Sequence, residues 1–191
     1  MKTKRIFIAI KITNTDEISK VFRQVGLELK EEKIKWVDKN GLHVTLLFLG
    51  TKNLEEIETI KNKLNGIANE FTAFRLRLRS LGAFPSINQP RILWAGINSA
   101  STLFELQKAI LYHLINHMPA EDYKYSPHLT IGRIKGGVKN PDRVKECILK
   151  WNEWEDCELL ITEFVLMESV LTQKGPVYDV LETFRLKRQN V

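Results

Sequence analysis

A pattern of residues that occurs twice constrains this chain more than any other feature. The segments LHVTLLFLG and PHLTIGR are apolar runs that each contain histidine, one intervening residue and threonine. Each follows a strand-like run, RIFIAI or RILWAGI, and an amphipathic helical pattern. The histidines, His43 and His128, are 85 positions apart, and Arg5 and Arg91 of the strand-like runs are 86 apart. Two copies of one strand-helix-strand unit predict an internal duplication.

The hydrophobic periodicity predicts alternating strands and helices. We expect strands at residues 5–12, 42–50, 74–81, 90–97, 127–133, 159–169 and 178–184. We expect helices within residues 16–31, 54–70, 101–117 and 141–151, and loops at 82–90 and 134–141. This order predicts a single domain, 1–191, built from two lobes with approximate sequence repeats 1–85 and 86–191. A pseudo-two-fold axis would bring His43 and His128 to equivalent places.

The bulk properties exclude several other classes of protein. The chain of 191 residues is 43% hydrophobic, enough for an ordinary core. Its first apolar run, residues 6–10, is too short for a signal peptide or a membrane span, so we expect a cytoplasmic protein with no membrane partner. Cys147 and Cys157 lack a CxxC spacing and are expected to be reduced thiols. A net charge of +6 makes a polyanionic partner plausible without establishing one.

The paired motif has a chemical rationale in phosphate chemistry. Residues two apart on a strand share a face, so His43 projects with Thr45, and His128 with Thr130. Imidazole titrates near neutrality, so one of two facing histidines can accept a proton while the other donates one. In-line cleavage of a phosphodiester needs both roles, on opposite sides of phosphorus. Threonine hydroxyls and Arg133 can hold the phosphate oxygens, and this chemistry requires no metal or other cofactor.

The sequence resembles the two-histidine phosphoesterases, and within them the RNA 2′,3′-cyclic phosphodiesterases once called 2′-5′ RNA ligases. The motifs that carry the resemblance span the chain: RIFIAI, WV, LHVTLLFLG, GAFP, PRILWAGI, SPHLTIGR and ESVLTQKGPVYDVLETF. The resemblance implies a bilobal α+β fold in which two antiparallel sheets flank a central groove and the helices lie outside. It also implies an enzyme that opens a terminal 2′,3′-cyclic phosphate to a 2′-phosphomonoester.

The resemblance, and not the spacing, assigns the roles of the two histidines. It implies that His43 is the proton donor to the leaving 3′-oxygen and that His128 is the proton acceptor that activates water. Thr45, Thr130 and Arg133 would bind the phosphate. The expected partners are RNA ends with a 2′,3′-cyclic phosphate or related cyclic nucleotides, and the expected state is a monomer. The reverse 2′-5′ joining reaction is the same chemistry with an alcohol in place of water.

Two further groups of residues have open interpretations. Trp36, Phe48 and Tyr125 are candidates to stack on a base, although core packing is at least as plausible for Phe48. The arginines at 75, 77 and 79 could follow an RNA backbone or form a solvated strand face. His113 and His117 have a spacing that can bind zinc, but HLINH lacks the glutamate of HExxH, so no metal site is expected.

A second class of function also fits the sequence. An RNA-end-binding module without catalysis would use the same cationic and aromatic side chains. Simple binding has no need for a matched acid and base, however, so the two intact motifs favour the enzyme.

Overall fold

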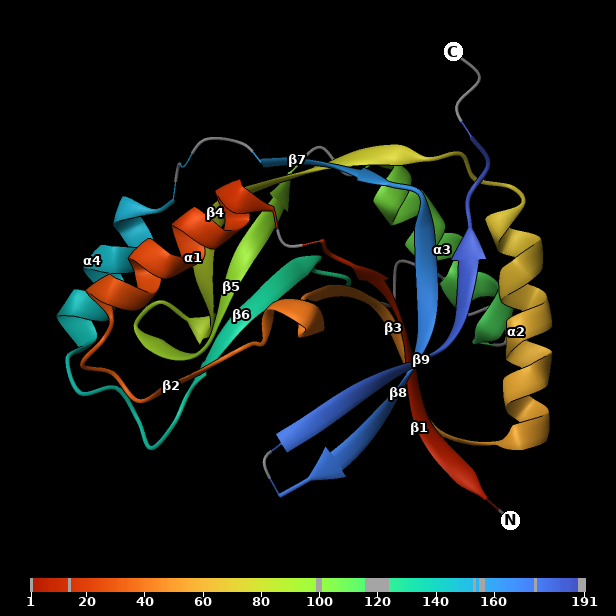
Figure 1. The fold of residues 1–191 in the computed structure, drawn as a ribbon, viewed down its shortest axis with the longest axis horizontal. Coiled ribbons are helices and arrows are strands. Elements are labelled where there is room, and N and C mark those ends of the chain that lie inside the picture. Colours follow the sequence, from red (N-terminus) through yellow and green to blue (C-terminus); the bar gives the residue numbers. More distant parts are fainter. Residues whose placement is uncertain are drawn as a thin grey trace.

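The computed structural model describes residues 2–13, 15–98, 101–115, 124–152, 154, 157–173 and 175–188. It contains nine strands: β1 (Thr3–Lys11), β2 (Ile34–Trp36), β3 (His43–Asn53), β4 (Phe74–Ser86), β5 (Gln89–Asn98), β6 (His128–Ile134), β7 (Cys157–Ile161), β8 (Glu163–Thr172) and β9 (Gly175–Arg185). Its helices are α1 (Asp16–Glu28), α2 (Leu54–Ala68), α3 (Ser101–Leu114) and α4 (Pro141–Lys150), with a 3-10 turn at Lys39–Gly41. Figure 1 shows their arrangement.

Polar side chains cap the N-termini of three of these helices. The side chain of Thr15 accepts a hydrogen bond from the amide of α1 at Ile18, and Asn53 forms a capping box with Glu56 at the start of α2. Asn140 caps α4, which begins with Pro141 at its first position. The chain therefore enters each of these helices through a side chain that satisfies an otherwise unpaired amide.

The strands form one antiparallel sheet that narrows at its centre. Their order is β7-β4-β5-β6-β3-β1-β8-β9, with β2 beside β6. The central strands β3 and β6 share one residue pair, Val44 with Leu129, so the sheet divides there into two parts. We call β3, β1, β8 and β9 the first lobe, and β6, β5, β4, β7 and β2 the second lobe. The predicted α+β fold with antiparallel strands is confirmed, and the two predicted sheets are the two parts of this one continuous sheet.

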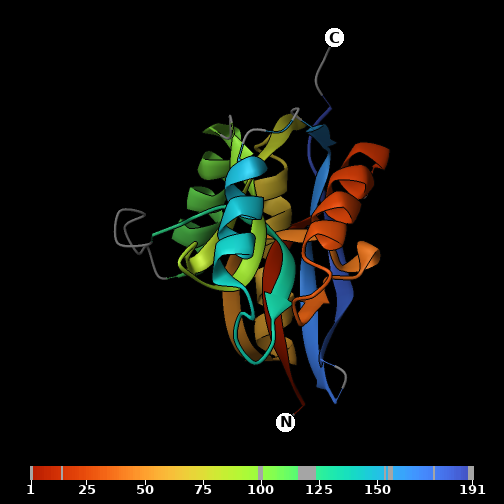
Figure 2. The ribbon, with the colours of Figure 1, turned by 90° about the vertical axis from the view of Figure 1, so that its left-hand side faces the viewer.

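The helices cover one side of the sheet, and each lobe receives its helices from both halves of the chain. Helices α2 and α3 pack together on the first lobe, where both contact β3. Helices α1 and α4 lie on the second lobe, at the end of the molecule nearest the viewer in Figure 2. Strand β4, from the first half of the chain, belongs to the second lobe. The lobes are therefore not contiguous halves, and the repeats 1–85 and 86–191 remain a prediction.

The hydrogen-bonded ladders of the two lobes have the same register. Lys11 of β1 pairs with His43 of β3, and Gly96 of β5 pairs with His128 of β6. Both members of the second pair lie 85 positions after their counterparts, and the other paired residues of β5 and β6 keep this offset. The alignment of RIFIAI with RILWAGI used an offset of 86. The structure therefore shifts that alignment by one residue.

A β-bulge interrupts strand β3 three residues after its histidine. Residues Thr45 and Leu47 have partners in β1, whereas the intervening Leu46 has none. Both Leu46 and Leu47 are buried as a result, and Phe48 turns to the face that carries Thr45. Strict alternation from His43 would have placed Phe48 on the opposite face.

Strand β6 has a bulge at the equivalent place. Thr130 and Gly132 have partners in β5, but Ile131 between them has none. Gly132 pairs with a core residue, Leu93, so the next residue, Arg133, turns to the side that carries Thr130. We call this side the histidine face; the other side is covered by the helices and forms the core.

Most predicted elements are confirmed, and the prediction differs from the structure in three places. The predicted strand at 159–169 is two strands, β7 and β8, which belong to different lobes and meet at Thr162. The predicted loop at 82–90 contains the end of β4 and the start of β5, and the short strand β2 was not predicted. The turn at Gly136 and Gly137 is confirmed, with positive φ at both glycines. None of the helices described is long and apolar enough to cross a membrane.

Candidate active site

The two motif histidines open the central strands and lie near each other on the histidine face. Because β3 and β6 pair antiparallel at Val44 and Leu129, this register places Thr45 opposite His128 and His43 opposite Thr130. Residues directly opposite share a face, and diagonal neighbours in such a pair are about 7–8 Å apart. These four residues therefore form the corners of a square, with the two histidines on one diagonal and the two threonines on the other. One phosphoryl group could accept hydrogen bonds from several of these side chains.

Each imidazole ring is held by an equivalent contact with the backbone carbonyl two residues before it. Nδ1 of His43 donates to the carbonyl oxygen of Gly41, and Nδ1 of His128 donates to that of Ser126, each at 2.7 Å. A ring that donates from Nδ1 leaves Nε2 as the nitrogen that gains or loses a proton. In both rings, Nε2 is therefore the nitrogen that could take part in proton transfer.

The electrostatic environments of the two histidines differ. Burial among apolar side chains lowers the pKa of His43, and the charges of Arg133 and His128 lower it further. The hydrogen bond to Gly41 acts in the opposite direction. An anionic phosphate between these groups would oppose the two positive charges and raise the pKa of His43 again.

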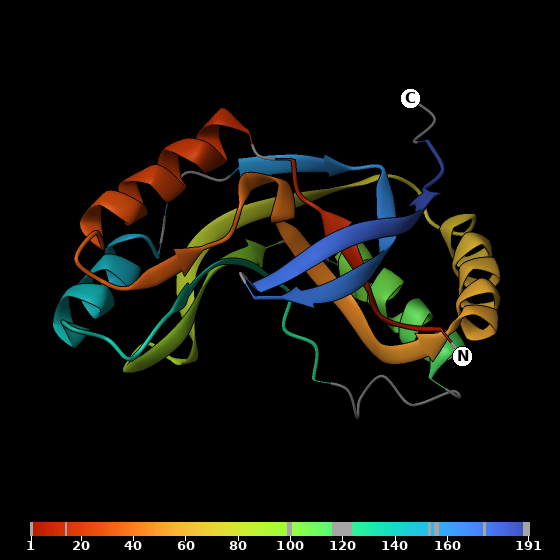
Figure 3. The same ribbon diagram turned by 60° about the horizontal axis from the view of Figure 1, so that its bottom comes forward.

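Aromatic rings that were not predicted as site residues surround both histidines. The ring of His43 has its centroid 5.2 Å from that of Phe7 and 5.0 Å from that of Tyr178 on β9. The ring of His128 lies 4.8 Å from Phe84 on β4. Figure 3 shows the β8-β9 hairpin, which carries Tyr178, crossing the middle of the molecule. GAFP and GPVY contain two of these aromatics, but periodicity did not connect them with the histidines.

Strand β2 places a second cation beside the predicted Arg133. On β2, Lys35 pairs with Arg133 in the ladder. A Cβ atom built on Gly175, at the tip of the β8-β9 hairpin, would overlap Nζ of Lys35. The lysine ammonium therefore reaches from β2 to the hairpin, and sequence reasoning did not identify it.

The three predicted stacking residues have different positions. Phe48 lies on the histidine face with 64% of its surface exposed, and its ring centroid is 5.8 Å from that of Phe7. The Tyr125 hydroxyl donates to the carbonyl of Thr45 at 3.1 Å, so this tyrosine supports β3 from beside the core. Trp36 packs against Gly132 on the helix side, away from Arg133. The structure therefore brings only Phe48 of these three to the histidine face.

The remaining sequence candidates lie elsewhere. Arg75 and Arg77 project from β4 on the side opposite the buried leucines, and both form ion pairs with Glu158. His113 is exposed on α3, and His117 lies outside the described residues. Within the described ranges, no cluster of three or more histidine, cysteine, aspartate or glutamate side chains could hold a metal ion.

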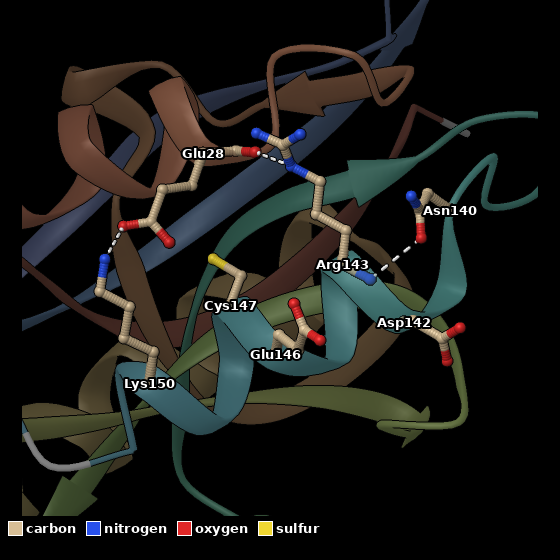
Figure 4. A pocket seen from close by; sticks show the side chains of 7 residues that line it. All are labelled: Glu28, Asn140, Asp142, Arg143, Glu146, Cys147 and Lys150. Atoms are coloured by element: carbon tan, nitrogen blue, oxygen red, sulfur yellow. Dashed lines mark hydrogen bonds and ion pairs between the residues drawn. The ribbon is translucent and has the colours of Figure 1, made fainter.

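A hollow of about 670 Å³ lies between the end of α1 and α4, apart from the histidines (Figure 4). Its lining includes Cys147, and burial together with the negative charge of Glu28 raises the pKa of this thiol to about 12. Lys150 forms an ion pair with Glu28 at 2.7 Å, and Nε of Arg143 donates to the Glu28 carbonyl. The cysteine is a protonated thiol near neutrality and is not a nucleophile.

A glycine leaves space for the ring of Trp94 beside His128. A Cβ atom on Gly82 would overlap the indole, so Gly82→Ala must displace the ring. We expect this substitution to lower the free energy of unfolding by about 1–3 kcal/mol, measured in urea. Gly66→Ala in α2, where nothing lies within 4 Å, is the matched control and should raise it by about 0.4–1 kcal/mol. Equal stability of the two variants would contradict the packing shown here.

Comparison with known proteins identifies the class of this fold and site. A model described as LigT like Phosphoesterase matches residues 10–94. The RNA 2′,3′-cyclic phosphodiesterase of Archaeoglobus fulgidus is 32% identical over 181 residues, 94% of this chain and 99% of that protein. The corresponding protein of Aquifex aeolicus is 35% identical over 88% of this chain and 93% of its own. The chain is thus a member of the two-histidine phosphoesterase class.

Solved structures agree with this assignment. The protein TT0787 of Thermus thermophilus is 28% identical, with a TM-score of 0.76 over 97% of this chain and all of that one. Escherichia coli LigT in its apo form, at 20% identity, has the same fold with a TM-score of 0.71. Within the class, this chain belongs to the RNA 2′,3′-cyclic phosphodiesterase family.

Proposed function

We propose that this protein hydrolyses the 2′,3′-cyclic phosphate at an RNA end to a 2′-phosphomonoester. The observation that carries the proposal is the matched pair of histidines. Each ring is held through Nδ1 by a backbone carbonyl, so both Nε2 atoms are available for proton transfer on one face. Relatives that align over most of this chain are RNA 2′,3′-cyclic phosphodiesterases.

The reaction breaks one bond and forms another at phosphorus. Nε2 of His128 takes a proton from water as the water oxygen attacks, and Nε2 of His43 gives a proton to the departing 3′-oxygen. The 2′-oxygen stays bonded to phosphorus, and the 3′-hydroxyl is released. After these two transfers His128 is protonated and His43 is neutral, and proton exchange with solvent returns each histidine to its starting state.

The neighbouring polar side chains can hold the phosphate during this step. The hydroxyls of Thr45 and Thr130 lie on the other diagonal of the square and can donate to the non-bridging oxygens. Arg133 has a charge close enough to lower the pKa of His43, and it would offset the developing negative charge. An RNA hydroxyl in place of water would run the same step toward 2′-5′ joining.

We further propose that the enzyme acts in the cytoplasm as a monomer on RNA ends or small cyclic nucleotides. Both cysteines, Cys147 and Cys157, are free and buried, which suits a reducing compartment. The excess of basic residues suits a polyanionic substrate.

The decisive experiment is hydrolysis of an oligonucleotide that ends in a 2′,3′-cyclic phosphate, with excess EDTA. We expect conversion to the 2′-phosphate, identified by phosphorus NMR against authentic 2′- and 3′-phosphates. Binding without turnover would instead support a non-catalytic RNA-end-binding module, and formation of the 3′-phosphate would exclude the bond cleavage proposed above.

A further inference from the structure

Four basic residues form a strip that leaves the histidine face along β2. In the ladder between β2 and β6, Lys35 is directly opposite Arg133. Two positions further on, the backbone amide of Lys135 donates to the carbonyl of Lys33 at 2.7 Å. Residues two apart on a strand share a face, so both pairs lie on one side, while the intervening Ile34 packs against the core. We call Lys33, Lys35, Arg133 and Lys135 the basic strip.

We propose that the basic strip binds the phosphates of the RNA chain upstream of the cyclic phosphate, so that the enzyme prefers an RNA end to a mononucleotide. The inference rests on the proposed function and specifies the substrate class of the same site. Lys35 takes the first upstream phosphate, beside Arg133, which holds the reacting one. Lys33 and Lys135 together take the next.

The basic strip has an energetic cost that a bound anion offsets. Directly opposite residues of an antiparallel pair have Cβ atoms about 4.5–5.5 Å apart, and like charges there destabilise the sheet. Two such pairs follow each other here, and all four residues are exposed. The carboxylate of Glu32, the residue before Lys33, is turned to the loop before α4, where the amides of Lys139 and Asn140 donate to it. The phosphates of the substrate supply the missing negative charge.

The basic strip begins at the candidate site and has the spacing of a phosphate chain. Arg133 is close enough to lower the pKa of His43. Nζ of Lys35 lies against Gly175 of the β8-β9 hairpin, so this cation is where the two lobes meet. From there β2 and β6 run together toward the end of the molecule that carries α1 and α4 (Figure 1). Same-face residues of a strand repeat about every 6.6–6.8 Å, comparable to neighbouring phosphates in single-stranded RNA.

The arginines of β4 offer a second path for a phosphate backbone, but the structure favours β2. Arg75 and Arg77 both form ion pairs with Glu158, so a phosphate would have to displace a carboxylate there. Strand β5 also separates β4 from β6 and its histidine. The basic strip, by contrast, is continuous with the side chains proposed to hold the reacting phosphate.

The first test compares substrates that differ in the number of upstream phosphates. Adenosine 2′,3′-cyclic phosphate has none, the adenosine dinucleotide with the same end has one, and the pentanucleotide has four, all with a 5′-hydroxyl. For the unmodified protein we expect KM to fall about tenfold from the mononucleotide to the pentanucleotide at low salt, and the difference to shrink as salt rises. A KM that does not depend on chain length would overturn the inference.

Substitutions in the basic strip should act according to their distance from the histidines. Lys35→Gln should raise KM about tenfold for both the dinucleotide and the pentanucleotide. Lys33→Gln combined with Lys135→Gln should raise KM for the pentanucleotide by a similar factor and leave the mononucleotide unchanged. The matched control is Lys108→Gln, which removes an exposed charge from α3 on the helix side. The same loss in this control, or equal losses on the mononucleotide and the pentanucleotide, would overturn the proposed RNA path.

Two further measurements separate RNA binding from a structural role. Each phosphate contact that is lost should lower the slope of log KM against log salt concentration by about 0.7. Urea unfolding should show the strip variants to be as stable as the unmodified protein or more so, because they relieve like-charge pairs. Lower stability with an unchanged salt slope would mean a structural role and overturn the inference.

The unmodified protein distinguishes the two proposals. If it hydrolyses neither the mononucleotide nor the pentanucleotide, the proposed function fails and this inference fails with it. If it hydrolyses both with the same KM, the proposed function stands and only the role of the basic strip fails.

Discussion

His43→Ala and His128→Ala should each lower kcat for cyclic phosphate hydrolysis by about 10²–10⁴-fold, with EDTA present throughout. Each substitution removes one of the two imidazole rings that backbone carbonyls orient through Nδ1, and with it an Nε2 atom that the proposed mechanism uses for proton transfer. Because the proposed mechanism places both transfers in one displacement step, the double variant should lose much less than the product of the single losses.

His113→Ala provides the matched control for these variants. This histidine is exposed on α3, where its ring contacts Tyr112, and it lies outside the candidate site. Its removal should leave kcat unchanged. Circular dichroism and urea unfolding should establish that all variants are folded. Turnover within threefold of the unmodified protein by either motif variant would rule out two-histidine catalysis.

Arg133→Gln should lower kcat/KM by about 10²–10³-fold and also change its dependence on pH. The positive charge of Arg133 lowers the pKa of His43 in the free enzyme. Activity that needs protonated His43 falls as the pH rises through this pKa. Removing the charge raises the pKa, so the alkaline limb of the kcat/KM profile should move to higher pH.

Arg91→Gln, on the neighbouring strand β5, removes the same charge from an exposed position and is the control for net charge. It should leave the alkaline limb where it is. If the limb moves by equal amounts in both variants, Arg133 acts only through the total charge of the protein. If it moves in neither variant, the alkaline limb does not report the titration of His43.

Alternation along the strands predicted the core side of the motif correctly. Leu42, Val44 and Leu46 are buried, as are Leu129 and Ile131. The same alternation could not predict the side on which Phe48 and Arg133 lie, because each bulge shifts the pattern by one residue. A signal is present in hindsight: Leu46-Leu47 and Ile131-Gly132 are adjacent residues that are both buried.

Other parts of the site depend on contacts that no local pattern contains. Tyr178 meets His43 because β8 and β9 return to β1 from the far end of the chain. The carbonyls of Gly41 and Ser126 orient the rings through the backbone conformation that precedes each strand. Trp36 was predicted near the site on its aromatic character alone, and the packing against Gly132 placed it on the other side of the sheet.

The exchange of elements between the lobes has a consequence for how the chain is made. Strand β1 is synthesised first but gains its second neighbour only when β8 emerges, and α1 packs beside α4, which follows more than a hundred residues later. Neither lobe can be completed by a nascent N-terminal half. Closing such distant contacts slows folding, and it also makes unfolding one shared event, so that a weakened strand in either lobe destabilises the site as a whole.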